Sequence, residues 1–213
     1  LALNLLLENI IHAREDSEDI ECNLWVLDEN LAPNDITQGV RKSKIPLTLI
    51  CNRFDLQQQL KTNKVSSTFS DFDFGDIEDD SVSRIFYRVS KEKTVVHHII
   101  NQSFRVLKPG GTLAIAGYKN EGVKTYIDKA NKLFNGAASK SKGGQSSHFA
   151  LISKGSTSHG SMLDDKDYTH HRTINIHSQN ISFISKPGQF GWNKTDKGSE
   201  LLIQYLPDVL RKR

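Results

Sequence analysis

Sulfur-containing residues are scarce in this chain of 213 residues, which has two cysteines, Cys22 and Cys51, and one methionine, Met162. In a parallel sheet Cys22 would start one strand and Cys51 would end the next, so the two thiols would lie at opposite edges. We therefore expect two buried free thiols, which fit a reducing compartment. Because the chain opens on Leu1 and not on an initiator methionine, we also expect a processed or truncated piece of a longer protein.

Long apolar runs are absent as well. No stretch approaches the roughly 20 residues needed to span a bilayer, and no basic leader precedes a short hydrophobic core. We therefore expect a soluble, cytoplasmic protein with no membrane partner. The charged fraction is an ordinary 25% and the net charge is only +3, so the composition permits a nucleic-acid partner without requiring one. A chain of this length can bury a real core as one α/β domain with an appendage.

The most informative stretch is a helix-to-strand junction. Residues 94–107 form an apolar helical pattern, and Lys108-Pro109-Gly110-Gly111 then ends the helix, because proline cannot continue it and glycine permits a tight reversal. Residues 112–116 are apolar and partly β-branched, which is typical of a buried strand. A helix that ends in this way and turns into a strand resembles the late crossover of class I S-adenosylmethionine-dependent methyltransferases.

That resemblance implies an α/β fold, with a doubly wound, mostly parallel sheet of the Rossmann-like type. Periodicity along the chain predicts further helices at 1–13, 56–64 and 123–134, and strands at 24–27, 46–51, 67–69, 83–89 and 148–154. We expect a domain over residues 1–155, a linker over 156–169, and a short C-terminal β-hairpin and helix over 170–213. The hairpin strands are expected at 172–176 and 181–184, with a turn at 178–180. In the last helix, we expect four side chains to face a core: Leu201, Leu202, Tyr205 and Leu206.

The loop after the first strand lacks the residues that hold a cofactor in this fold. Class I methyltransferases resembling this chain have a loop like Asp-x-Gly-x-Gly, whose glycines let the backbone approach the cofactor. Here residues 28–35 contain no glycine, the next one is Gly39, and Pro33 stiffens the loop. The second strand ends in Asn52-Arg53 where many such enzymes have an acidic residue for the ribose hydroxyls. Asp55 follows, and we interpret it as the N-cap of the helix at 56–64.

The segment after the fourth strand lacks the catalytic motif of amino-group methyltransferases. In those enzymes an Asn-Pro-Pro-Tyr or Asn-Pro-Pro-Phe motif holds the target nitrogen and flanks the base. Residues 88–93 of this chain read Arg-Val-Ser-Lys-Glu-Lys, with neither the amide nor the prolines. We therefore assign no catalytic residue.

A second resemblance lies near the end of the chain. Pro187-Gly188-x-Phe190, then Asp196-x-Gly198-x-x-Leu201-Leu202 and Leu206-Pro207, resemble the junction in bacterial ribosomal RNA guanine-N2 methyltransferases of the small and large subunit type. Those proteins are built from two tandem class I folds, of which the first is degenerate and the second catalytic. The chain departs from the family at Phe190-Gly191-Trp192, where the family usually has Phe-Ser-Arg.

This resemblance implies that the chain is the N-terminal, degenerate and non-catalytic domain, with a C-terminal catalytic domain of the same protein as its partner. It also implies S-adenosylmethionine as the methyl donor, bound by that catalytic domain, and ribosomal RNA or a ribosomal subunit as the substrate. Phe190 would lie near the cofactor edge of the catalytic half, or would only pack the junction. Two alternatives stay open. One is a self-contained methyltransferase for a small molecule or protein, holding cofactor through Asp28, Glu29 or Asn30, and the other is a dimerisation module without RNA affinity.

Basic side chains are the candidates for RNA contact in the degenerate domain. Residues 136–147 are flexible by composition, so their lysines could follow a phosphate backbone or could simply be solvated. The expected RNA-binding residues are Arg41, Lys42, Lys44, Lys140, Lys142, Arg211, Lys212 and Arg213.

No metal site is predicted. The acidic residues at 71–80 give only fragments of a calcium-loop pattern, so a solvated, mobile loop is expected there. His97 and His98 are adjacent in a helix and point about 100° apart, which prevents them from sharing one metal and favours surface or groove positions. His170, His171 and His177 have no cysteine nearby.

Overall fold

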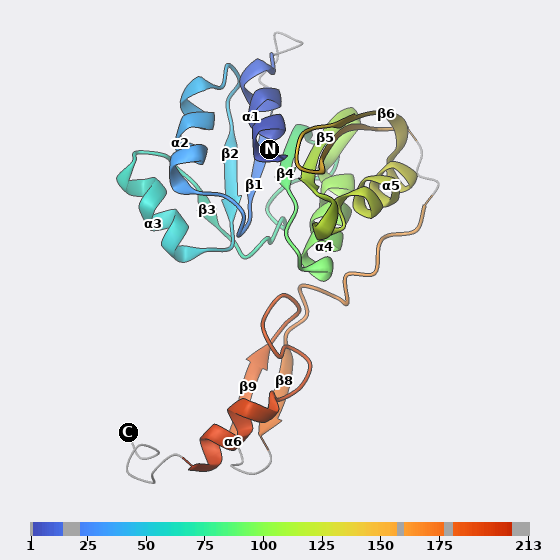
Figure 1. Cartoon of the computed structure of the whole chain (residues 1–213). Coiled ribbons are helices and arrows are strands. Elements are labelled where there is room, and N and C mark those ends of the chain that lie inside the picture. Colours follow the sequence, from blue (N-terminus) through green and yellow to red (C-terminus); the bar gives the residue numbers. More distant parts are fainter. Residues whose placement is uncertain (1, 15–21, 157–159, 177–180, 206–213) are drawn as a thin grey trace. The chain divides into compact units, whose positions relative to one another are not determined.

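The computed structural model describes residues 2–14, 22–156, 160–176 and 181–205 (Figure 1). The chain divides into two compact units, Leu1–Leu163 and Asp164–Arg213. In the part of the chain that is described, no helix has the length and apolar character needed to cross a membrane.

The first unit is built on a seven-stranded sheet in the order β3-β2-β1-β4-β5-β7-β6. Neighbouring strands from β3 to β5 are parallel, whereas β7 is antiparallel to both β5 and β6. The strands are β1 (Asn23–Leu27), β2 (Thr48–Cys51), β3 (Thr68–Phe69), β4 (Val82–Arg88), β5 (Leu107–Tyr118), β6 (Asn135–Lys142) and β7 (Ser147–Lys154). This is the predicted doubly wound, mostly parallel sheet of the class I methyltransferase type.

Helices cover both faces of this sheet. They are α1 (Ala2–His12), α2 (Pro33–Lys42), α3 (Phe54–Thr62), α4 (Lys93–Val106) and α5 (Val123–Phe134), with a short 3-10 helix η1 (Lys119–Glu121) before α5. Side chains of α1, α2 and α3 share one apolar core with β1 and β2, and α4 and α5 pack against each other and against β5. The helix and the strand that were predicted at the helix-to-strand junction are present as α4 and β5.

Trp25 sets the spacing between β1 and α2. Its side chain is fully buried, and a Cβ atom added at Gly39 would lie 2.7 Å from the indole ring. Only glycine leaves room for this ring, because such a contact is far inside van der Waals distance. Gly39 therefore serves the packing of the core.

The first residues of β5 include two glycines that its course requires. Gly110 has φ +81°, a left-handed conformation that favours glycine, and a Cβ at Gly111 would lie 2.8 Å from the carbonyl oxygen of Lys108. The ladder with β4 begins at Leu107, which pairs with Val82, and its register shifts before Arg84. The strand thus starts earlier than the predicted residue 112.

The acidic segment 71–80 is not the solvated, mobile loop that its composition predicts. Phe72 and Phe74 are buried, at 0% and 1% exposure. The guanidinium of Arg105 on α4 donates to the carbonyl oxygens of Phe74 (2.7 Å) and Ile77 (2.9 Å) and pairs with Asp79. The prediction was wrong because two aromatic side chains and one arginine anchor a segment whose carboxylates face outward.

His97 and His98 are also buried, at 2% exposure each, and not at the surface or in a groove as expected. The Nε2 of His98 donates to the carbonyl oxygen of Phe72 (2.9 Å), and the Nε2 of His97 accepts from Lys129 (3.1 Å). Both rings satisfy polar groups between α4 and its neighbours, which explains their burial.

Three further expectations fail. Residues 135–142 form strand β6, because the ladder with β7 supplies the order that the sequence composition lacks. Asp55 lies inside the first turn of α3 and pairs with Arg53, which is the N-cap and has no side-chain cap bond. Cys51 is buried as expected, Cys22 is only half-buried, and both thiols are free, with pKa values raised by burial.

The second unit contains the predicted hairpin, β8 (Arg172–Ile176) with β9 (Ile181–Ser185), and a helix α6 (Lys197–Tyr205). The turn at 178–180, His177 and residues 206–207 lie outside the described residues. Leu201, Leu202 and Tyr205 are exposed at 55%, 66% and 79%, which contradicts the expectation that they face a core. A two-stranded hairpin offers too little apolar surface to cover a helix.

Phe72 tests whether segment 71–80 is anchored. Phe72→Ala is expected to lower the free energy of unfolding by about 3–5 kcal/mol, because it leaves a cavity under the segment. Phe69→Ala is the matched control: Phe69 is 46% exposed and touches Phe54 edge to face, so about 1 kcal/mol is expected. Urea denaturation of both variants measures the difference, and equal losses would show that the segment is not packed.

Candidate ligand-binding edge of the sheet

The strand order reverses between β1 and β4, which lie side by side although β2 and β3 intervene in the sequence. In open α/β sheets ligands bind outside the carboxyl ends of the strands at this reversal. The residues that follow β1, β4 and β5 therefore form the candidate site.

Asp28 follows β1 and its carboxylate is turned into the protein. The side chain is 4% exposed, Oδ2 accepts the phenol proton of Tyr87 (3.0 Å), and Oδ1 accepts from the backbone N–H of Glu29 (2.7 Å). Burial raises the pKa of Asp28, and these hydrogen bonds partly offset it. Burial, together with the charge of Asp28, raises the pKa of Tyr87 well above its usual value. The acceptors of Asp28 are thus engaged by β4 and by its own loop.

The rest of this loop is also engaged. The side-chain amide of Asn30 donates to the carbonyl oxygen of Val89 after β4 (2.9 Å), and Leu31 is buried at 3% exposure. Pro33 then begins α2. A glycine-rich loop lets a cofactor approach the backbone. Here the side chain of Asn30 instead binds the segment after β4, and the side chain of Leu31 fills the interior. These residues do not match the loop that holds S-adenosylmethionine.

The carboxyl end of β2 offers little to a ribose. Arg53 and Asp55 bind each other, with Arg53 Nε donating to Asp55 Oδ1 (3.2 Å), and the arginine lowers the pKa of the carboxyl. The Oδ1 atom of Asn52 is buried without a hydrogen-bond partner among the described residues. The amide oxygen of Asn52, a neutral acceptor, thus stands where many class I methyltransferases have a carboxylate.

A buried ion pair occupies the end of β4. Arg88 and Glu121 of η1, at 4% and 7% side-chain exposure, form a bidentate contact of 2.7 and 2.8 Å. Glu121 Oε2 also accepts from the backbone N–H of Tyr118 (2.7 Å), and the guanidinium lies 5.0 Å from the centroid of the Tyr118 ring. The sequence analysis missed this cluster. Its only signal was a charged residue at the end of an apolar strand.

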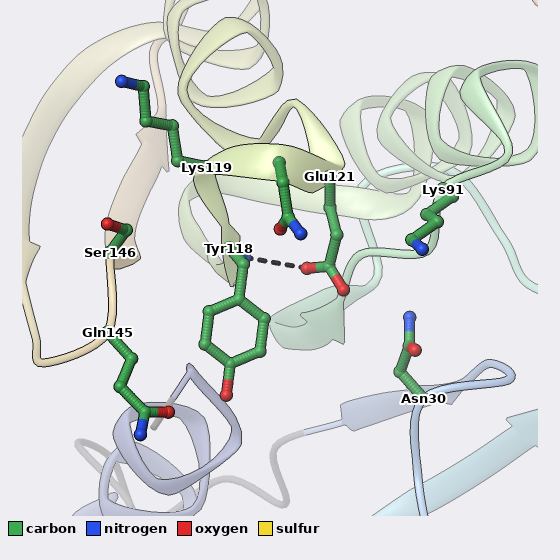
Figure 2. A pocket seen from close by; sticks show the side chains of 8 residues that line it. Asn30, Lys91, Tyr118, Lys119, Glu121, Gln145 and Ser146 are labelled. Atoms are coloured by element: carbon green, nitrogen blue, oxygen red, sulfur yellow. Dashed lines mark hydrogen bonds between the residues drawn. The ribbon is translucent and has the colours of Figure 1, made fainter.

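A pocket of about 690 Å³ opens beside this ion pair. Figure 2 shows the Tyr118 ring projecting between Asn30 and Gln145, with Lys91 and Lys119 on opposite sides. The full lining is Asn30, Lys91, Tyr118, Lys119, Asn120, Glu121, Gln145 and Ser146. The pocket therefore draws on the ends of β1, β4 and β5 and on the turn between β6 and β7.

Positive charges also act on His148, which follows Ser146 of the pocket lining by two residues. Burial, followed by the positive charges of Lys124, Lys142 and Lys119, lowers the pKa of His148. Lys142 lies directly opposite His148 in the β6–β7 ladder, and Lys119 also lines the pocket. The carboxyl edge of the sheet is thus positively charged at this end.

Those predicted RNA-binding residues that the structure describes do not gather on one surface. Arg41 and Lys42 form the exposed last turn of α2, with exposed Lys44 after it; α2 runs back from the carboxyl edge, so they lie toward the amino edge. Lys142 lies at the carboxyl edge, and Lys140 pairs with Asp128 of α5 (2.7 Å). Arg211, Lys212 and Arg213 lie outside the described residues. Phe190, in the second unit, is 89% exposed.

The buried pair gives a stability prediction. Glu121→Gln is expected to lower the free energy of unfolding by about 3–5 kcal/mol, because Arg88 would keep a buried charge without a counterion. The double variant Arg88→Met/Glu121→Leu removes both charges and is expected to lose less than the single one. Urea denaturation of the three proteins completes the test, and a loss under about 1 kcal/mol in Glu121→Gln would mean that the pair is solvated.

His148 gives a pH prediction. Its NMR titration midpoint is expected below the usual 6.5, and Lys124→Ala/Lys142→Ala should raise it, whereas Lys132→Ala should not. Since the folded chain binds this proton less readily than the unfolded chain, the contribution to stability is complete above pH 6.5. It is lost as the pH falls toward the folded pKa. An unchanged midpoint in the double variant would contradict the lysine cluster.

Comparison with known proteins adds the following. No protein-family profile matches the chain. Ribosomal RNA small subunit methyltransferase C of Shewanella loihica is 26% identical over 125 residues, covering 59% of this chain and 35% of that protein. The protein of the same name from Psychromonas ingrahamii is 23% identical over 190 residues, covering 77% and 51%. The chain thus spans about half or less of the length of these relatives.

Among solved structures, the 16S rRNA N2 methyltransferase RsmC of T. thermophilus, in complex with AdoMet and guanosine, superimposes with a TM-score of 0.74 at 16% identity. The match covers 98% of this chain and 52% of that one. The PH0226 protein of Pyrococcus horikoshii gives a TM-score of 0.54 at 12% identity, covering 72% and 88%. The chain therefore has the class I methyltransferase fold, and its curated relatives are ribosomal RNA methyltransferases.

Proposed function

We propose that this chain is the non-catalytic part of a ribosomal RNA guanine-N2 methyltransferase, which recognises RNA and supports a separate catalytic domain. S-adenosylmethionine is then held by that catalytic domain and not by this one. The RNA partner is ribosomal RNA or a ribosomal subunit, in the cytoplasm. In this proposal the domain covers residues 1–155, and residues 156–169 link it to the hairpin and helix.

The closed loop after β1 carries this proposal. Asp28 is hydrogen-bonded to Tyr87, Asn30 to the carbonyl oxygen of Val89, and Leu31 is buried. Opening the loop for a cofactor would break both hydrogen bonds and expose an apolar side chain, and each loss costs free energy. The absence of an Asn-Pro-Pro motif after β4 agrees with this, because Arg88 and Glu121 fill that end of the strand.

The lengths of the relatives support a second domain. The solved RsmC chain matches almost all of this chain with 52% of its own length. The second unit also exposes apolar side chains, which a neighbouring domain would cover. These are Ile184, Phe190, Leu201, Leu202 and Tyr205. We propose that Phe190 meets the catalytic domain near its cofactor edge.

The self-contained enzyme is the second candidate. It requires Asp28, Glu29 or Asn30 to hold S-adenosylmethionine, and two of these side chains are already engaged. The buried, unpaired Oδ1 of Asn52 is the observation in its favour. The third candidate, a dimerisation module, predicts no affinity for RNA.

Calorimetric titration of the whole chain with S-adenosylmethionine tests the proposal. We expect no heat of binding from a sample that melts cooperatively, because Asp28 and Asn30 of the loop after β1 already bind other groups and Leu31 fills the interior behind them. A cofactor-binding class I methyltransferase, titrated in the same buffer, is the positive control. Micromolar binding to this chain would overturn the proposal and make the self-contained enzyme the leading candidate.

A further inference from the structure

We propose that the pocket beside Tyr118 binds one nucleotide of single-stranded RNA, with the phosphates on its two sides near Lys91 and Lys119 and its base against the Tyr118 ring. This inference rests on the proposed function, because it names the RNA site of a domain that recognises RNA. It adds residues absent from the sequence-based set of RNA contacts, namely Asn30, Lys91, Tyr118, Lys119 and Gln145.

The size and place of the pocket suit such a ligand. Its volume of about 690 Å³ falls within the roughly 300–1,000 Å³ of small-molecule sites. It lies at the reversal of strand order, where open α/β sheets place ligands. The neighbouring end of β1 is closed by Asp28 and Asn30, so a ligand at this edge would enter beside β4 and β5.

The charges of the pocket select an anion. The ammonium groups of Lys91 and Lys119 are exposed, and the described part of the chain gives neither a carboxylate partner. Glu121 is the single carboxylate in the lining, and Arg88 and the backbone N–H of Tyr118 already bind it. The pocket therefore presents two positive charges to an RNA backbone, and Lys124 and Lys142 extend this field beyond it.

The remaining lining suits an unpaired base. Unpaired bases in RNA stack on aromatic rings and are read through hydrogen bonds at their edges. The Tyr118 ring projects into the pocket, and Asn30 and Gln145 flank it (Figure 2). Each amide offers both donors and acceptors. A base within a duplex exposes no face to such a ring, so the pocket favours single strands.

The turn between β6 and β7 is held in shape before any ligand binds. Gln145 and Ser146 have φ of 55° and 58°, and Ser147 Oγ donates to the carbonyl oxygen of Gly144 (2.7 Å). The backbone N–H of Lys119 donates to the carbonyl oxygen of Ser146 (3.0 Å), which ties η1 to the turn. Because the wall is preorganised, little ordering entropy opposes binding.

Fluorescence anisotropy with a short labelled single-stranded oligoribonucleotide tests this site in the whole chain. Lys91→Ala/Lys119→Ala is expected to reduce the slope of log K against log salt by about 1.4, the value for two phosphate contacts on a single strand. Lys61→Ala/Lys132→Ala removes the same charge from exposed positions on α3 and α5 and should leave the slope nearly unchanged. Equal effects of the two double variants would overturn the proposal.

The base contact has its own test. Tyr118→Leu is expected to weaken binding by about 5-fold or more, and an oligonucleotide made of abasic sites should lose affinity for the native chain but not for the variant. Gln145→Ala, at an exposed turn position, repeats the measurement with little risk to folding. Abasic and normal oligonucleotides that bind equally well would reject the base contact. Equal displacement by polyglutamate would show a site for any polyanion and overturn the proposal.

Two outcomes distinguish a wrong pocket from a wrong function. If the native chain binds the oligonucleotide and the pocket variants bind as tightly as the control variant, this pocket is not the site, although the proposed RNA role stands. If the native chain has no affinity for RNA, the pocket and the proposed function both fall.

Discussion

The hydrogen bond from the phenol of Tyr87 to the carboxylate of Asp28 joins β4 to β1 at the point where the strand order reverses. A buried carboxylate without partners is costly, so Asp28 keeps its place only while Tyr87 and the Glu29 amide satisfy it. That requirement fixes the course of the loop after β1, and Asn30 then reaches Val89. At the edge of the sheet that a cofactor would use, the loop after β1 is therefore hydrogen-bonded to β4 and to the residue that follows it.

Along the same edge of the sheet, the pocket beside Tyr118 opens at the ends of β4 and β5. Arg88 and Glu121 neutralise each other under the pocket, which leaves the lysines at its rim as the net charge. A buried ion pair contributes little to stability in comparison with an apolar pair of similar size. Its value here lies in position: it orients η1, contacts the Tyr118 ring and neutralises the one acidic side chain of the pocket lining.

The sequence was most informative where periodicity and turn residues agree. Residues 94–118 show this, because apolar spacing, Pro109 and two glycines all indicate a helix followed by a strand. It failed at β6, whose alanines, serines and lysines carry no apolar alternation and whose order comes from β7. It also failed at Phe74, because Arg105, which donates to the carbonyl oxygen of Phe74, lies 31 positions further along the chain.

The candidate site was only half visible in the sequence. The missing glycines after β1 were plain to see, and the structure accounts for them through Asn30 and Leu31. The contacts that build the site could not be seen in the sequence. Asp28 binds Tyr87, which is 59 positions away, and Arg88 binds Glu121, which is 33 positions away. Such pairs depend on strand order, which local patterns do not encode.

Amide hydrogen exchange at Glu29 measures whether the Asp28 carboxylate stays turned toward Tyr87, because Asp28 accepts from both the Glu29 N–H and the Tyr87 phenol. We expect slow exchange in the native chain, unchanged by S-adenosylmethionine, and faster exchange in Tyr87→Phe. Fast exchange in the native chain that slows when S-adenosylmethionine is added would contradict it, since the loop would then be an open cofactor site.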